Sequence, residues 1–264
     1  MYKRQKYIQD DFKIIKNSEI QSGFYDMLVN CPSIAEKARP GQFINILCSD
    51  KPLRRPISIC EIDKESGNIR MVYQVRGEGT EWMSRLCESE IINLLGPLGN
   101  GFTIPAKSRR MAVVGGGIGT PPLLGAAKQY LADNSERSCT AVLGFRNKSA
   151  VILEEDYKAV CDTVVTTDDG SYGEHGLVTV PLESEIAKGG IDVIIACGPT
   201  PMLKAVAAVG EKHGITTFVS LEQRMGCGVG ACLACACKIK LAGEETYLKV
   251  CTHGPVFNAS KVVW

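Results

Sequence analysis

The sequence predicts an α/β protein with an additional all-β domain, arranged as three modules along 264 residues. Up to about residue 105, short segments of alternating polar and apolar residues are separated by Gly and Pro, which is typical of a small β-barrel or sandwich. Near residue 108 the pattern changes to buried strands followed by helices, as in α/β nucleotide-binding domains. The end of the chain is rich in Cys and Gly. We therefore expect modules at 1–107, 108–221 and 222–264.

The order of elements within the first two modules follows from this periodicity. In the first module we expect a short helix near 80–86 and strands at 12–16, 23–29, 42–47, 57–60, 69–75 and 91–96. In the second we expect strands at 111–114, 139–145, 163–166 and 192–197 and helices at 123–131 and 202–213. Strand-then-helix units of this kind predict a parallel sheet.

Composition excludes several classes of function. The chain is 45% hydrophobic and 22% charged with a net charge of +1, and its Lys and Arg residues are spread evenly, so no nucleic-acid partner is expected. The basic segment 1–6 runs into Asp10 and Asp11 without an apolar stretch, and no apolar run approaches membrane-spanning length. We expect neither export nor membrane insertion, and a reducing cytoplasm fits the seven single cysteines before residue 200.

Four cysteines in the third module have the most specific spacing in the chain. Cys227, Cys232, Cys235 and Cys251 form the pattern Cys-x4-Cys-x2-Cys followed by a distant fourth cysteine, which is the plant-type [2Fe–2S] ligand pattern. Each iron needs two thiolates, so one loop must supply three sulfurs. Gly226, Gly228 and Gly230 let that loop adopt positive φ and bring N–H groups close to sulfur.

Other interpretations of these cysteines are weaker. A zinc ribbon normally has two Cys-x2-Cys knuckles, whereas this chain has one. Disulfides do not fit a chain whose other cysteines are scattered singly. Cys237 could replace Cys235 as a ligand if the loop register shifted, because only the x2 gap distinguishes them.

Two glycine-rich loops are expected at one edge of the parallel sheet. The segment 115–122 follows a strand and opens a helix, so its N–H groups and the helix N-terminus could hold a pyrophosphate. Thr120 stands where a dinucleotide fingerprint would have its third glycine, and a tight turn that binds nothing is the alternative. The segment 196–202 would end a strand at the same edge, where open α/β sheets bind ligands.

Charged residues suggest how a nucleotide would be recognised. Asp168 follows a predicted strand and could bind a ribose, which favours NAD, or could form an ordinary Asx turn. Arg146 and Lys148 could instead receive the 2′-phosphate of NADP. In the first module, Arg55 could pair with a phosphate and Ser58 could donate to a ring nitrogen, although a surface strand explains both residues equally well.

Together, the segments 55–58, 115–120 and 197–202 and the cysteine loop resemble the ferredoxin-reductase-like flavoproteins. Within that superfamily the chain is similar to the electron-transfer subunits of class 1B (NAD-dependent) dihydroorotate dehydrogenase, over essentially its whole length. The resemblance implies an N-terminal FAD-binding β-barrel, an NAD-binding α/β domain and a C-terminal [2Fe–2S] module.

The resemblance also assigns site residues. FAD would contact Arg55, Pro56, Ile57, Ser58, Val72, Tyr73, Gln74, Gly79 and Thr80. NAD would contact Gly117, Ile118, Gly119, Thr120, Cys197, Gly198, Pro199 and Thr200. Ile57 replaces the tyrosine of the wider superfamily, so the aromatic contact from that position is absent, and Tyr73 is the expected stacking residue.

The family's function is electron transfer in pyrimidine (UMP) biosynthesis. Electrons would pass between NAD and an FMN-containing catalytic subunit through FAD and the cluster, in a complex of two copies of each subunit, with the orotate site on the partner. Two alternatives remain. One is the small subunit of an NADH-dependent ferredoxin:NADP oxidoreductase, a family in which Asp takes the position of Cys227. The other is a zinc-stabilised nucleotide-binding protein without catalytic activity.

Overall fold

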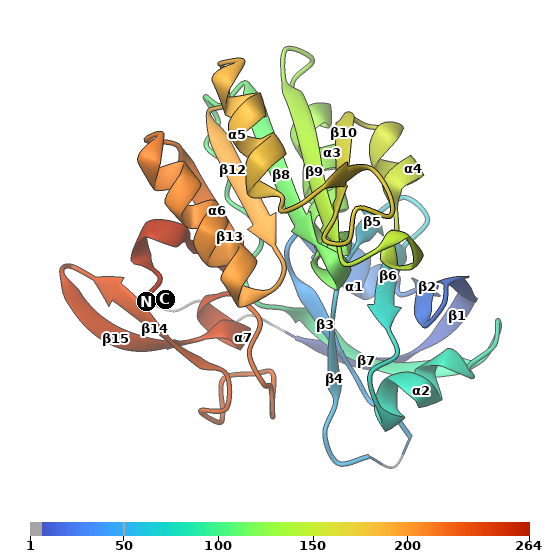
Figure 1. Cartoon of the computed structure of the whole chain (residues 1–264). Helices are drawn as coiled ribbons and strands as arrows, with labels where there is room; N and C mark the ends of the chain where they lie inside the picture. The colour runs from blue at the N-terminus through green and yellow to red at the C-terminus, as the bar shows by residue number, and fades with distance from the viewer. Residues whose placement is uncertain (1–6, 50) are drawn as a thin grey trace.

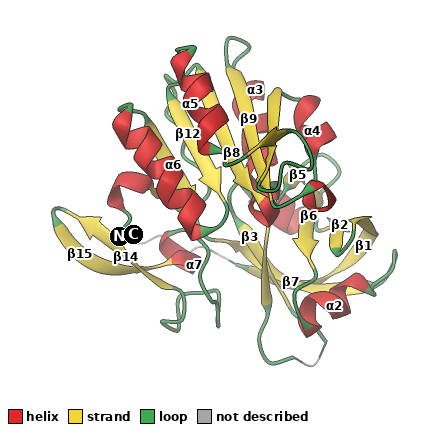
Figure 2. Cartoon of the chain, in the orientation of Figure 1, coloured by secondary structure: helices red, strands yellow, loops and turns green. Residues whose placement is uncertain are grey.

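The computed structural model describes residues 7–49 and 51–264. The basic segment 1–6, on which part of the expectation about export rests, lies outside the described residues. The described chain forms a curled antiparallel sheet, a parallel sheet covered by helices, and a small hairpin module beside them (Figures 1 and 2). No helix among the described residues is long and apolar enough to cross a membrane.

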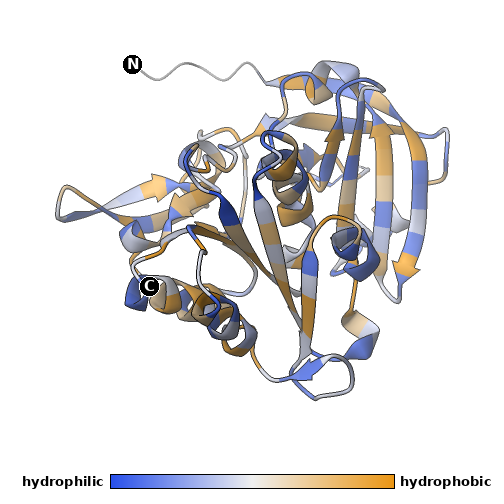
Figure 3. Cartoon of the chain, turned by 90° about the horizontal axis from the view of Figure 1, so that it is seen from above, coloured by the Kyte–Doolittle hydropathy of each residue, from blue (hydrophilic) through white to orange (hydrophobic). Residues whose placement is uncertain are grey.

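The curled sheet has seven strands in the order β4-β3-β7-β1-β2-β6-β5. Its strands are β1 (Ile8–Gln21), β2 (Phe24–Asn30), β3 (Phe43–Ile46), β4 (Arg55–Ser58), β5 (Glu61–Asp63), β6 (Asn68–Gln74) and β7 (Ile91–Leu98). Two short helices join them, α1 (Pro32–Ala35) and α2 (Glu78–Ser84). Hydrophilic and hydrophobic residues alternate along several of these strands (Figure 3). One face therefore encloses a core that includes Ile14, Met27, Ile44 and Ile69. Because the strand order ends at β4 and β5 without joining them, the sheet is a half-barrel.

The second sheet has the order β11-β10-β9-β8-β12-β13-β16. Six strands are parallel: β8 (Arg110–Gly116), β9 (Ser138–Phe145), β10 (Asp162–Thr167), β11 (Glu174–His175), β12 (Val193–Cys197) and β13 (Thr216–Ser220). The helices are α3 (Pro121–Ala132), α4 (Glu154–Lys158), α5 (Thr179–Ala187) and α6 (Thr200–Lys212), with 3₁₀ turns η1 (Gly117–Gly119) and η2 (Lys148–Ala150). The almost fully buried runs of β8 and β12 are apolar because helices cover both faces of the sheet.

The cysteine-rich module is built on a hairpin. It contains β14 (Ala236–Leu241), β15 (Glu244–Lys249), α7 (Val250–His253), β16 (Val256–Asn258) and η3 (Ala259–Lys261). Ala242 and Gly243 both have positive φ, as the type I′ form of a two-residue hairpin turn requires. The strand β16 pairs antiparallel with β13, so residues beyond 222 complete the nucleotide domain's sheet.

Candidate functional site

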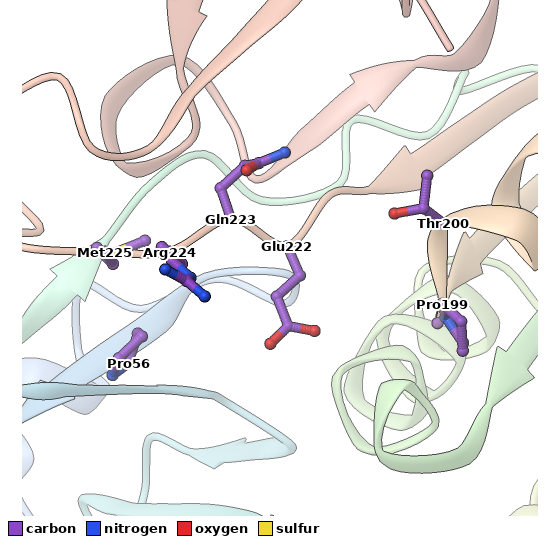
Figure 4. Close-up of a pocket in the computed structure, with 8 residues that line it drawn as sticks. Pro56, Pro199, Thr200, Glu222, Gln223, Arg224 and Met225 are labelled. Atoms are coloured by element: carbon purple, nitrogen blue, oxygen red, sulfur yellow. The ribbon is translucent and has the colours of Figure 1, made fainter.

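A cavity of about 440 Å³ lies where the three parts of the chain meet (Figure 4). Its lining consists of Pro56 from β4, Gly198, Pro199 and Thr200 at the start of α6, and the segment of Glu222, Gln223, Arg224 and Met225. Figure 4 shows the carboxylate of Glu222 in the space between Pro56 and Pro199. The last segment leads directly into the cysteine loop. Residues 222–225 form no motif, so their sequence alone does not predict a site.

The two predicted glycine-rich loops lie against each other. Gly115 and Cys197 are register partners on adjacent parallel strands. A Cβ added to Gly119 would lie 2.4 Å from the carbonyl oxygen of Cys197, so only glycine allows this backbone contact. Gly117 has φ +53°, and a Cβ there would meet nothing within 4 Å. The backbone after β8 is therefore open toward a ligand at the sheet edge, beside the loop after β12.

Two of the residues predicted to contact the nucleotide also pack against the protein. Ile118 packs against the apolar core beside α3. Thr120 is fully buried, and its hydroxyl oxygen would lie 2.8 Å from a Cβ on Gly115. The side chain of Thr120 thus occupies room left by Gly115, which explains why this turn closes without a third glycine. Its carbonyl oxygen accepts a hydrogen bond of 2.8 Å from Tyr157 Oη.

The start of α6 is suited to an anionic ligand. Pro199 and Thr200 are exposed at the N-terminus of this 13-residue helix and line the cavity. The N–H groups of a first helical turn have no partner within the helix, and the helix dipole favours negative charge there. A nucleotide phosphate at this end of the cavity would satisfy both.

The charged residues that bear on NAD or NADP lie on neighbouring loops. Asp168 is exposed at the end of β10, where its N–H donates to the Phe145 carbonyl at 3.0 Å. His175 Nε2 lies 3.1 Å from the Asp168 carbonyl oxygen. Arg146 follows β9 directly, and its carbonyl accepts from the N–H of Asp169 at 3.3 Å. Because the acidic Asp168 and the basic Arg146 lie at the same edge of the sheet, their positions alone favour neither NAD nor NADP.

On the half-barrel, Arg55 and Gly79, both predicted to contact FAD, lie against each other. A Cβ on Gly79 would lie 2.6 Å from Arg55 Nε, so the arginine side chain lies directly against the start of α2. Arg55 Nη1 donates to the Leu53 carbonyl at 2.7 Å. The hydroxyl of Thr80 accepts from the N–H of Arg76 at 2.8 Å and therefore shapes the turn. A guanidinium at a helix start is suited to phosphate.

The stacking role expected of Tyr73 is wrong. Its side chain is 1% exposed and belongs to the half-barrel core. The hydroxyl donates to Asn17 Oδ1 at 3.1 Å, and the ring stacks on Tyr25 at a centroid distance of 5.7 Å. Strand periodicity explains the error, since alternate residues of β6 face opposite sides. Tyr73 lies on the inner face, whereas Val72 packs toward the nucleotide domain and Gln74 is half-buried.

The four predicted ligand cysteines form two pairs. Cys235 Sγ and Cys251 Sγ lie 3.3 Å apart and are buried. Cys227 Sγ accepts a hydrogen bond of 3.3 Å from the N–H of Cys232. Among the residues that the structure describes, no group of three or more His, Cys, Asp or Glu side chains is arranged to hold a single metal ion. Two thiolates for each of two irons is the requirement of a [2Fe–2S] cluster, so this donor set fits that group.

The loop backbone stabilises the thiolate form in the pair of Cys227 and Cys232. Burial raises the pKa of Cys227, but N–H groups of Cys232, Val229 and Ala231 outweigh it and lower the pKa to about 7. Gly228 and Gly230 have positive φ, as expected. Gly226 does not have positive φ. Its lack of a side chain lets the backbone lie close to the Cys232 thiol, because a Cβ at position 226 would lie 3.3 Å from Cys232 Sγ.

Cys237 belongs to neither of the two cysteine pairs. Its thiol points to the Leu248 carbonyl at 3.5 Å within the hairpin. The geometry therefore favours Cys235 over Cys237 as the partner of Cys251.

Comparisons with known proteins agree with this geometry. Residues 113–208 match the model of the oxidoreductase NAD-binding domain, and residues 222–263 match the iron–sulfur cluster binding domain of dihydroorotate dehydrogenase B. The fold and site thus define an NAD-binding oxidoreductase with an iron–sulfur module. The chain belongs to the family of electron transfer subunits of dihydroorotate dehydrogenase B (NAD(+)), which confirms the predicted family.

The similarity extends over nearly the whole chain. The protein of that name from Geobacillus kaustophilus (strain HTA426) is 42% identical over 90% of this chain and 92% of its own. Its counterpart from Streptococcus mutans serotype c (strain ATCC 700610 / UA159) is 39% identical over 97% and 98%.

Solved structures confirm the ferredoxin-reductase-like fold class. A structure of NADH-dependent reduced ferredoxin-NADP oxidoreductase is 32% identical, with a TM-score of 0.85 over 96% of this chain and 90% of that one. A ferredoxin reductase of carbazole 1,9a-dioxygenase is 18% identical, with a TM-score of 0.67 over 79% and 67%, and shows the fold alone.

Proposed function

We propose that this chain is an electron-transfer subunit that carries electrons between NAD and an FMN-containing dihydroorotate dehydrogenase catalytic subunit, using FAD and a [2Fe–2S] cluster. One observation carries the proposal. A single cavity is lined by the half-barrel, by the helix start after β12 and by the segment that enters the cysteine loop. A nucleotide, a flavin and a cluster held by these three elements would therefore be neighbours.

The chain's own residues would position the reactants. The contact between Gly119 and Cys197 keeps the two nucleotide loops at one edge, and the start of α6 faces the cavity from that side. Arg55 of β4, whose side chain lies beside the start of α2, would bind a phosphate of the flavin dinucleotide. Hydride transfer depends on placing donor and acceptor in contact more than on an acid or base, so we assign no catalytic residue.

The cofactors supply the redox chemistry when bound: a flavin exchanges electron pairs with NAD and single electrons with an iron–sulfur cluster. The cysteine pairs would hold the cluster at the end of the segment 222–225, and Cys227 is the ligand that the loop's N–H groups favour as a thiolate. The remaining predicted contacts, including Ser58, Gln74, Gly198 and Asp168, are part of this proposal.

The partner and setting follow from the family. An electron-transfer subunit requires a catalytic subunit, and we propose a heterotetramer of two copies of each, acting in the cytoplasm in pyrimidine biosynthesis. The orotate site would lie on the partner. We further propose NAD rather than NADP, because the related electron transfer subunits are named for NAD(+).

The small subunit of an NADH-dependent ferredoxin:NADP oxidoreductase is the second candidate, because a structure of such an enzyme is 32% identical to this chain. That family has Asp at the first ligand position, where this chain has Cys227. This difference favours the dihydroorotate system.

The first test is the visible spectrum of anaerobically purified protein, with iron, acid-labile sulfide and flavin quantified. We expect one flavin and two irons per chain, whereas a colourless zinc protein would contradict the proposal.

The second test mixes the chain with a candidate catalytic subunit. Dihydroorotate-dependent NAD reduction is expected, and its absence would argue against this partner.

A variant pair isolates the cluster's role. Cys232→Ser should lose the cluster while keeping FAD and NADH-driven flavin reduction, so that transfer to the partner stops. Cys87→Ser, at an exposed cysteine of the half-barrel, is the control and should retain full transfer. Normal transfer by Cys232→Ser would show that the assigned relay is wrong.

A further inference from the structure

Asn45 is a buried polar residue between the half-barrel and the cysteine loop. It lies on β3, where its neighbours Ile44 and Ile46 face the half-barrel core. Strand alternation directs Asn45 to the opposite face, toward the cysteine-rich module. Its partner on β4 is Pro56, which lines the cavity. Asn45 is 1% exposed.

The carboxamide of Asn45 has no hydrogen-bond partner among the described residues. Both Nδ2 and Oδ1 are buried and unpaired. Buried polar groups are nearly always paired, because leaving one unpaired forfeits its hydrogen bonds to water. The surroundings do not compensate, since the side chain of Leu98 lies on the same face of the sheet. The carboxamide therefore keeps a donor and an acceptor available for a group other than a protein side chain.

The unpaired amide lies directly against the cysteine loop. A Cβ added to Gly228 would lie 2.5 Å from Asn45 Nδ2 and 3.4 Å from its Cγ. Gly228 has φ +73° and is the residue after Cys227. The absence of a side chain at position 228, in a backbone conformation that favours glycine, lets the carboxamide approach the first ligand position.

We propose that Asn45 is a positioning residue for the iron–sulfur site, whose side-chain N–H donates a hydrogen bond to a sulfur of the bound cluster or its Cys227 ligand. This inference rests on the [2Fe–2S] cluster of the proposed function. A hydrogen bond to sulfur stabilises the reduced cluster, which carries one more negative charge. Asn45 would thus raise the cluster's reduction potential.

The test compares the wild-type chain with Asn45→Leu, which keeps similar volume and removes the donor. Both chains are loaded with FAD and cluster, and both potentials are measured by redox titration followed by electron paramagnetic resonance and absorption. We expect the cluster of Asn45→Leu to be about tenfold harder to reduce, equal to a shift of ~59 mV to more negative potential for a one-electron couple. The flavin potential should stay unchanged.

A second measurement, the melting temperature of the protein without its cluster, should show that removing the Asn45 amide is stabilising. In chains stripped of iron with a chelator, Asn45→Leu should melt at a higher temperature than wild type, because it replaces an unpaired buried amide with an apolar group. Thr166→Val is the matched control. Thr166 is also buried and unpaired but lies in the nucleotide domain, so this variant should leave the cluster potential unchanged.

The possible results distinguish a failure of the role proposed for Asn45 from a failure of the proposed function. Wild-type protein without iron and sulfide would refute the cluster itself. A wild-type chain that holds the cluster, with an Asn45→Leu potential equal to wild type, would overturn the role of Asn45 and indicate a buried water as its partner. A shift confined to the flavin would also overturn it. If Asn45→Leu does not fold, Asn45→Ser is titrated instead, with the same expected direction.

Discussion

Arg70 on β6 donates a hydrogen bond to Asp156 in α4 and thereby joins the half-barrel to the nucleotide domain. The same guanidinium also bonds Asp26 at 2.9 Å and Glu61 at 2.6 Å. Burial lowers the pKa of Arg70, but the hydrogen bonds to Asp156, Asp26 and Glu61 raise it above its ordinary value. One cation thus holds three carboxylates at the boundary between the domains.

Arg70→Met should destabilise the protein by about 2 kcal/mol, because it removes the hydrogen-bonded guanidinium from three carboxylates, of which Asp26 and Glu61 keep a lysine partner. Urea unfolding of the loaded protein measures this. Arg85→Met removes a cation from an exposed pair with Glu81 and should cost far less. Equal losses for the two variants would contradict a structural role for the Arg70 cluster.

Gly119→Ala should weaken NADH binding at least tenfold, because its Cβ would meet the backbone of Cys197 and separate the nucleotide loops. Gly117→Ala meets open space and should cost only the ~1–2 kcal/mol of a left-handed backbone. NADH affinity by calorimetry and thermal melting distinguish these effects. If both variants bound NADH normally, the two loops would not form the nucleotide site.

Cys235→Ser should lose iron and sulfide, because it removes one member of the pair with Cys251. Cys237→Ser should retain both, since its thiol points to Leu248 inside the hairpin. Iron and acid-labile sulfide analysis of anaerobically purified variants gives the answer. The reverse result would mean that the loop register shifts when the cluster assembles.

Stability should fall in alkali because burial raises the pKa of Cys31 to about 12 and that of Cys48 to about 11, from an ordinary value of 9.0. A raised pKa in the folded state contributes stability below pH 9 that is lost as pH rises, since the unfolded chain ionises first. Each thiol should lower the free energy of unfolding by about 1.4 kcal/mol at pH 10. Urea titrations at pH 7 and pH 10 measure the loss, which Cys31→Val should reduce.

Local sequence signals were sufficient for much of the fold. The apolar runs of β8 and β12 and the glycine-rich turns after them predicted the parallel sheet, because a doubly covered strand excludes polar residues. The expected helix at 202–213 is α6, which begins at Thr200. The helices α4 and α5 and the hairpin β14–β15 were missed. Residues 244–247 of β15 are all exposed, so no alternation of polar and apolar residues marks this strand.

The site was predictable where chemistry constrains residue spacing. Cysteine spacing predicted the ligands, but the 2 + 2 pairing is visible only in three dimensions. Glu222 was missed because its segment reads as an ordinary polar loop until the fold sets it opposite Pro56. Asn45 was missed because a single polar residue in an apolar strand indicates nothing until its unpaired amide is seen beside Gly228.

The pairing of β16 with β13 has a mechanical consequence. The chain leaves the parallel sheet at Ser220, forms the cysteine loop and returns so that Val256 pairs with Ser220 itself. Leu221 and Pro255 add a further backbone hydrogen bond of 2.9 Å at the same place. Both ends of the module are thus fixed to one strand, and it cannot swing as a tethered carrier would. Internal electron transfer would cross a constant gap by tunnelling, at a rate that does not slow in a viscous solvent.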